Sequence, residues 1–73
     1  MAQASREIML EPLTEREVAV LRLLRGSLSR REIAAELHLS VNTVKGYTAS
    51  LYRKLAVDSR ADAVARAAEL GVS

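Results

Sequence analysis

The most constraining feature of this chain is a pair of helix-start signals with one short helical segment and a three-residue turn between them. The first signal is Ser29, with Glu32 three positions later, and the second is Ser40. Serine starts helices because its hydroxyl accepts a hydrogen bond from a backbone amide of the first turn. The turn, residues 38–40, is so short that the two helices must cross steeply and leave one face of the second uncovered. The spacing therefore predicts a helix-turn-helix.

Two further helix starts flank this pair. Leu13-Thr-Glu-Arg-Glu17 has the form of a capping box, and Ser59 has Asp62 three positions later. Gly26 and Gly71 are placed to end the first and last helices. The expected helices cover residues 15–24, the segment between Ser29 and the turn, residues 41–55 and residues 60–70.

No segment shows the two-residue alternation of a β-strand, so every expected element is helical. The predicted fold class is all-α, a four-helix bundle-like domain with a central helix-turn-helix. Residues 1–12 lack periodicity and are expected to be a flexible N-terminal tail or linker stub, which leaves residues 13–73 as the domain. Residues at helical spacing predict the buried core: Val20, Leu21, Leu24, Ile33, Ala34, Leu37, Val44, Thr48, Leu51, Leu55, Ala63, Val64, Ala67 and Leu70.

The composition excludes several classes of protein. The chain has no cysteine, so it can form no disulfide and no cysteine-based zinc site. Its single histidine, His38, has no partner at metal-ligand spacing, and no apolar run approaches the roughly 20 residues of a membrane span. No cysteine nucleophile, glycine-rich phosphate loop or convergent carboxylate pair is present. We therefore expect a cytoplasmic protein that is no enzyme and binds no metal or cofactor.

The helix over residues 41–55 carries the clearest functional signal. Its residues include Lys45, Arg53 and Lys54 but no acid, although the net charge of the whole chain is only +2. At 100° per residue, Asn42, Gly46, Ala49 and Arg53 lie opposite the packing seam. Small side chains there would let the helix backbone enter a DNA major groove, which is about 12 Å wide. This face predicts binding to double-stranded DNA.

The candidate base-contacting residues are Lys45, Asn42 and Ala49. A lysine donor favours guanine O6 or N7, whereas Asn42 could pair with adenine or hold a phosphate. Ala49 shares this face but has no long side chain to offer. A solvated surface position is the alternative interpretation of Lys45.

The candidate contacts to the DNA backbone are cations and hydroxyl groups at helix ends. A helix N-terminus favours phosphate because its first backbone amides are unpaired. Thr43 could equally be only a good helix-start residue, and Ser29 is a cap first. A phosphate contact is favoured over plain solvation for Arg53, whereas Lys54 could equally be solvated. The full set is Thr43, Arg53, Lys54, Arg30 and Ser29.

Five motifs occur in order along the chain: Leu13-Thr-Glu-Arg-Glu17, Glu32-Ile-Ala34, Ser40-Val-Asn-Thr-Val-Lys45, Lys54-Leu55 and Arg60-Ala-Asp-Ala-Val64. Together they resemble the LuxR/GerE-type helix-turn-helix domain of bacterial transcription regulators, over residues 13–72. The resemblance looks closer to the large ATP-binding, maltose-regulator-like branch than to response regulators.

This resemblance implies a four-helix domain whose third helix reads the major groove and whose fourth often mediates dimerisation on inverted half-sites. By position, Lys45 falls on the family's base-contacting lysine and Thr43 on a threonine associated with the DNA backbone. Three positions depart from the family pattern. Gly46-Tyr47 stands where a residue followed by histidine is usual, Ala49 is short, and Ala56 replaces a glycine. We expect strain at Ala56, where the helix over residues 41–55 ends. We also expect the preferred DNA sequence to differ from that of typical family members.

The last helix carries small residues that its own docking does not need. Ala61, Ala65 and Ala68 remain free to meet a second copy, which predicts a homodimer on DNA. RNA polymerase is a further candidate partner. Two alternatives stay open: a helical protein-interaction module that docks RNA polymerase or a sensor domain, and a sigma-factor region of similar architecture. The run Arg60-Ala-Asp-Ala-Val64 argues against the second.

Overall fold

The computed structural model describes residues 12–71, which form four α-helices and, within that range, no strand. The helices are α2 (Glu15–Leu24), α3 (Arg30–Leu37), α4 (Val41–Leu55) and α5 (Arg60–Leu70). The predicted all-α fold with a central helix-turn-helix is therefore confirmed. Apart from Pro12, the tail predicted for residues 1–12 lies outside the described residues, as do residues 72 and 73 of the predicted domain.

The helices begin where the sequence places their caps. At the start of α2, the Thr14 amide donates to Glu17 Oε1 at 2.9 Å and the Glu17 amide donates to Thr14 Oγ1 at 3.1 Å. The same reciprocal pair joins Ser29 and Glu32 at the start of α3, at 2.8 and 3.1 Å. Each box satisfies two backbone amides that a helix end would otherwise leave unpaired. Ser40 and Ser59 cap α4 and α5 with single hydroxyl acceptors.

Two helices end on residues in the left-handed conformation that are not glycine. His38 ends α3 at φ 59° and Ala56 ends α4 at φ 60°. At the end of α4, the Val57 amide donates to the Tyr52 carbonyl at 3.0 Å and so satisfies a terminal carbonyl of the helix. An alanine in this region costs roughly 1 kcal/mol relative to glycine, because its Cβ crowds the following carbonyl. The expected strain at Ala56 is thus a backbone strain.

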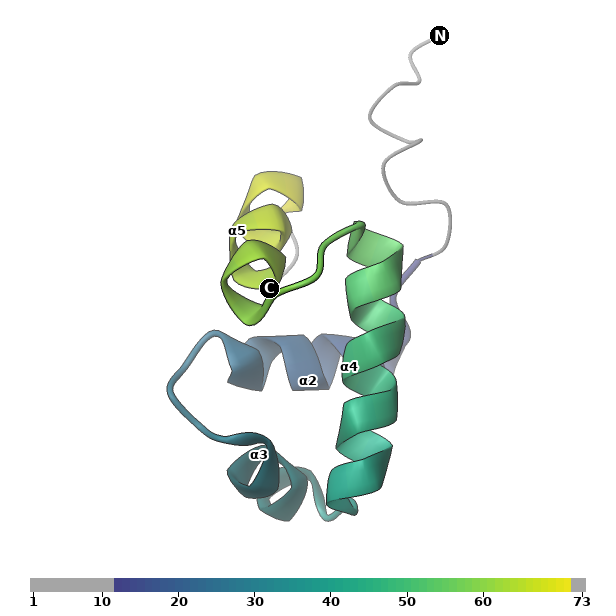
Figure 1. Cartoon of the computed structure of the whole chain (residues 1–73), viewed down its shortest axis with the longest axis vertical. Helices are drawn as coiled ribbons and strands as arrows, with labels where there is room; N and C mark the ends of the chain where they lie inside the picture. Colours follow the sequence, from purple (N-terminus) through teal and green to yellow (C-terminus); the bar gives the residue numbers. More distant parts are fainter. Residues whose placement is uncertain (1–11, 72–73) are drawn as a thin grey trace, which may run out of the picture.

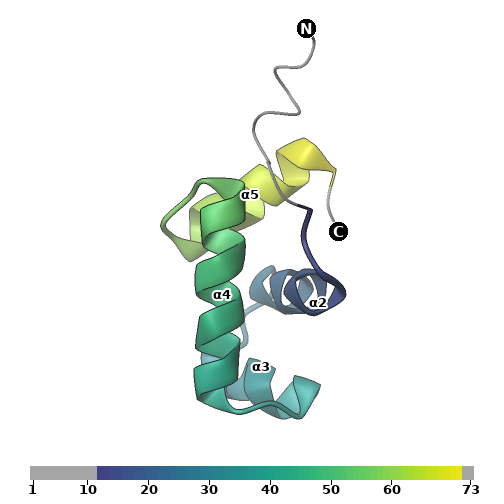
Figure 2. The ribbon, with the colours of Figure 1, turned by 90° about the vertical axis from the view of Figure 1, so that its right-hand side faces the viewer.

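The long helix α4 is the axis of the molecule. Helix α3 packs against its N-terminal end, α2 crosses its middle and α5 lies beside its C-terminal end. In Figure 1, α3 and α5 lie to the left of α4 and α2 passes behind it, and in Figure 2 both α2 and α3 lie to the right of α4. One side of α4 is therefore covered by no other helix of residues 12–71.

The core fills the space between α4 and the three shorter helices. The buried apolar side chains are those predicted from helical spacing, except that Leu37, Val64 and Leu70 are only half-buried. Glu17 is buried as well, which the spacing did not predict. The largest fully buried side chains are Leu21, Ile33, Leu51, Leu55, Val20 and Val44. Thr48 is buried too, because its hydroxyl donates to the Val44 carbonyl at 2.8 Å and leaves no polar atom unpaired. Among residues 12–71, no helix is long and apolar enough to cross a membrane.

Candidate nucleic-acid interface

The uncovered side of α4 brings the predicted base-contacting residues together. Asn42, Lys45 and Ala49 are all exposed, and so are Gly46 and Arg53 on the same helix. These residues recur at intervals of three and four positions, which places them along one face. The opposite face buries Val44, Thr48, Leu51 and Leu55 in the core. Because the core holds one face of α4, the orientation of the exposed face is fixed.

The N-terminus of α4 differs in charge from those of the other helices. Its cap Ser40 accepts a hydrogen bond from the Thr43 amide at 3.0 Å and donates one to Thr43 Oγ1 at 2.8 Å. No acid lies in its first turn, whereas α2, α3 and α5 each carry at least one there. The positive end of the α4 dipole is therefore not neutralised by a side chain, which favours an approaching anion. Thr43 itself is exposed.

The N-terminus of α3 contributes the two other predicted backbone contacts. Arg30 is its first residue and is exposed. The Ser29 hydroxyl accepts from the Glu32 amide, so its primary role is that of a cap.

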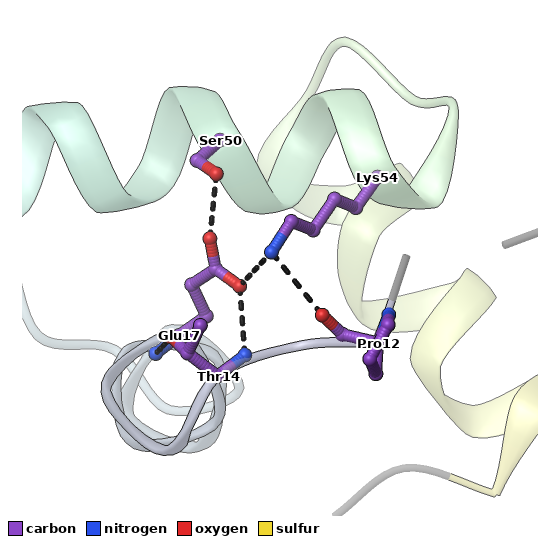
Figure 3. Close-up of polar contacts among 5 residues, drawn as sticks. All are labelled: Pro12, Thr14, Glu17, Ser50 and Lys54. Carbon is purple, nitrogen blue, oxygen red and sulfur yellow. Dashed lines mark hydrogen bonds and ion pairs between the residues drawn. The ribbon is translucent and has the colours of Figure 1, made fainter. Parts of the chain in front are cut away.

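Lys54 does not belong to the exposed face of α4 (Figure 3). Its ammonium group forms an ion pair with Glu17 Oε1 at 2.8 Å and donates to the Pro12 carbonyl at 3.2 Å. Only 10% of its side chain is exposed. Because of its position on the helix, the side chain of Lys54 points toward α2. Its positive charge is therefore paired with Glu17 inside the domain. We therefore leave Lys54 out of the proposed interface, although the sequence made it a candidate.

Glu17 is the centre of this polar cluster and is 3% exposed. It accepts hydrogen bonds from Lys54, from the Ser50 hydroxyl and from the Thr14 amide. Burial raises the pKa of Glu17, but these hydrogen bonds and the positive charge of Lys54 outweigh burial and hold the pKa at about 2. The buried carboxylate stays ionised and ties α2 to two successive turns of α4. Sequence reasoning identified Glu17 only as part of a capping box.

Arg60 links α5 to α2 in a way that the sequence did not indicate. Its Nε donates to the Leu24 carbonyl at 2.9 Å, and its Nη2 donates to the Gly26 carbonyl at 3.1 Å. The carbonyls at a helix C-terminus lack intrahelical partners and carry partial negative charge. A guanidinium group supplies both the missing hydrogen-bond donors and a compensating positive charge. Arg60 therefore helps to hold α5 beside the C-terminal ends of α2 and α4.

Helix α5 buries Ala63 and Ala67 and leaves the three predicted dimerisation residues exposed: Ala61, Ala65 and Ala68.

In the described part of the chain, no group of three or more His, Cys, Asp or Glu side chains could hold a metal ion.

A short capped helix, a tight turn and a longer helix with one acid-free face left open define a helix-turn-helix domain of the kind found in DNA-binding regulators. The model of the family "bacterial regulatory proteins, luxR family" (GerE) matches residues 11–67. The chain therefore belongs to the LuxR/GerE family, whose domains bind DNA in transcription regulation. The resemblance seen in the sequence motifs is confirmed.

Known relatives are considerably longer proteins. The HTH-type transcriptional regulators MalT of Klebsiella pneumoniae subsp. pneumoniae and of Klebsiella pneumoniae strain 342 are each 43% identical to this chain over 63 residues. That match covers 86% of this chain and 7% of each relative. The crystal structure of the response regulator ChrA, from a heme-sensing two-component system, superposes with a TM-score of 0.82 at 35% identity. The superposed region covers 99% of this chain and 37% of the ChrA chain.

Proposed function

We propose that this chain is the DNA-reading output domain of a bacterial transcription regulator that acts on specific double-stranded sites in the cytoplasm. Helix α4 enters the major groove with its uncovered face. The observation that carries this proposal is that face itself: it is exposed along the helix, contains Lys45 and Arg53, and has no acidic residue anywhere in α4. A major groove admits one α-helix and presents a distinct pattern of donors and acceptors for each base pair.

Within this interface, side chains divide between reading bases and holding the backbone. Lys45 and Asn42 donate to base edges, and Ala49 lets the edges approach because its side chain is short. Phosphates are held by the cations Arg30 and Arg53 and by the N-terminal ends of α3 and α4, at Ser29 and Thr43. These backbone contacts set the register in which Lys45 meets a base.

A single domain makes few contacts, so a symmetric pair should be the high-affinity form. The exposed alanines of α5, Ala61, Ala65 and Ala68, offer small side chains to a second copy. A pair on two half-sites gains affinity because the second contact becomes intramolecular.

Gly46 provides a test of close approach to DNA. A glycine inside a helix costs roughly 0.5–1 kcal/mol relative to alanine, yet a Cβ at this position would meet nothing within 4 Å. Packing inside the domain therefore gives no reason for the glycine, whereas a nearby DNA backbone or base does. We expect Gly46→Ala to raise the free energy of unfolding by about 0.5–1 kcal/mol and to weaken DNA binding. Urea unfolding and a binding titration on the same preparations measure both, and unchanged or tighter DNA binding would contradict a close approach at Gly46.

The direct test of the proposed function is fluorescence anisotropy of the chain with a labelled duplex pool. With two to four phosphates neutralised, affinity should fall about 10- to 100-fold between about 50 and 200 mM salt. If no salt-sensitive binding occurs even at several hundred micromolar protein, beyond the weak end of non-specific dissociation constants at about 100 micromolar, the chain is not a DNA-binding domain on its own. The protein-interaction alternative would then be favoured.

A further inference from the structure

Val41 is an apolar side chain on the surface of the proposed interface. It is 36% exposed and is the one large hydrophobic residue among residues 12–71 that is exposed. It is also the first residue of α4, directly after the cap Ser40. Isolated surface hydrophobes are common, so exposure alone assigns no role to Val41. Its position does, because the N-terminal residues of a helix-turn-helix recognition helix are those that contact base edges.

The start of a helix gives no local reason for a valine. Its branched Cβ restricts rotation in a helix and lowers its helix propensity. The other three helices begin with the charged residues Glu15, Arg30 and Arg60 at the same position. Val41 lies outside the buried core and is not among the partly buried side chains that pack against it.

Val41 and Lys45 are neighbours on α4. They are four residues apart, which places them one turn from each other on the same side of the helix, about 6 Å apart along its axis. Both are exposed. The surface that they share therefore combines an apolar group with a strong hydrogen-bond donor.

We propose that Val41 contacts the 5-methyl group of a thymine in the major groove, close to the guanine that Lys45 reads. Thymine is the base that presents a methyl group in this groove, and apolar side chains recognise it there. Because base pairs are stacked about 3.4 Å apart, a separation of about 6 Å places the thymine one or two base pairs from the guanine. This inference rests on the proposed function and adds a preferred base to it.

The test begins by selecting bound duplexes from a random pool with the 73-residue chain. Each thymine of the selected site is then replaced in turn by deoxyuridine, which removes the methyl group and leaves every hydrogen-bonding group in place. At one thymine near the guanine, we expect the replacement to weaken binding of the wild-type chain about fourfold, the value of one buried methyl group. Val41→Ala should weaken binding to the thymine duplex by a similar factor and bind the thymine and deoxyuridine duplexes equally.

Two controls make the result specific. Arg30→Ala should leave the ratio between thymine and deoxyuridine duplexes at its wild-type value, because a phosphate contact does not depend on the base. A thermal melt confirms that Val41→Ala remains folded. If wild type and Val41→Ala show the same ratio at every thymine while binding still requires Lys45, the thymine contact is wrong and the proposed function stands. If the wild-type chain selects no sequence at all, the proposed function fails and this inference fails with it.

Discussion

Replacing Lys54 with methionine should lower the free energy of unfolding by about 3 kcal/mol, the lower end of the range for breaking a buried ion pair by removing one partner. Methionine keeps much of the length of the side chain but leaves Glu17 ionised and 3% exposed, without its counter-charge. The Ser50 hydroxyl and the Thr14 amide remain as hydrogen-bond donors to it. They are neutral, so they compensate only part of the loss. Chemical denaturation at neutral pH measures the change.

Two variants separate the ion pair from general effects of losing a lysine. In the double variant Glu17→Gln/Lys54→Met, both charges are removed and most of the stability should return, because a buried pair is costly mainly when one partner is missing. Glutamine also keeps the capping box. Lys45→Met is the matched control: this lysine lies on the same helix but is exposed, and its change should stay within about 0.5 kcal/mol. Equal losses in Lys54→Met and Lys45→Met would show that the pair contributes nothing specific.

The dependence on pH follows from the pKa of Glu17, which is lowered from 4.5 to about 2. When pH falls below 4.5, the unfolded chain binds a proton at Glu17 before the folded chain does, so the unfolded state gains stability. The contribution of Glu17 is therefore complete above pH 4.5 and is lost as pH falls toward 2. The difference in stability between wild type and Lys54→Met should be constant near neutral pH and shrink over this acid range. A difference that stays constant down to pH 2 would exclude the ion pair as its cause.

Replacing Lys45 with alanine should weaken binding to a selected DNA site by about 10- to 100-fold, the range expected for one base-reading side chain. Binding to unselected DNA should fall much less, because there the lysine contributes only its charge. The exposed position of Lys45 on α4 means that the fold should not change. Anisotropy titrations with the selected duplex and with a scrambled duplex give both affinities.

Arg66→Ala is a suitable control for Lys45→Ala. It removes one positive charge from α5, where Arg66 forms a partly exposed ion pair with Glu69 at 3.5 Å. Because overall charge changes by the same amount, long-range attraction of DNA falls similarly in both variants. Only Lys45→Ala should reduce the ratio between selected and scrambled DNA. If the ratio is the same in wild type and Lys45→Ala, Lys45 is not a base-reading residue and specificity must be assigned elsewhere on α4.

Most of the secondary structure could be predicted from the sequence because its determinants are local. A cap such as Ser29 acts on an amide only three residues away, and so does the reciprocal bond of Glu32. Helical periodicity then places Val44, Leu51 and Leu55 on one buried face without knowledge of their partners. The exposed face of α4 lies opposite that buried face, which is why the exposed position of Lys45 could be predicted.

The roles of three charged residues were decided by tertiary structure alone. The sequence made Lys54 a candidate phosphate contact because it is a cation on α4. Its partner Glu17 lies 37 positions away, and no short-range pattern predicts that pairing. Glu17 looked purely local because its capping bond is complete within one turn. Arg60 binds carbonyls 34 and 36 positions earlier, at the end of α2. Local hydrogen bonds are set by spacing along the chain, whereas these contacts exist only once packing of the core has brought α2, α4 and α5 together.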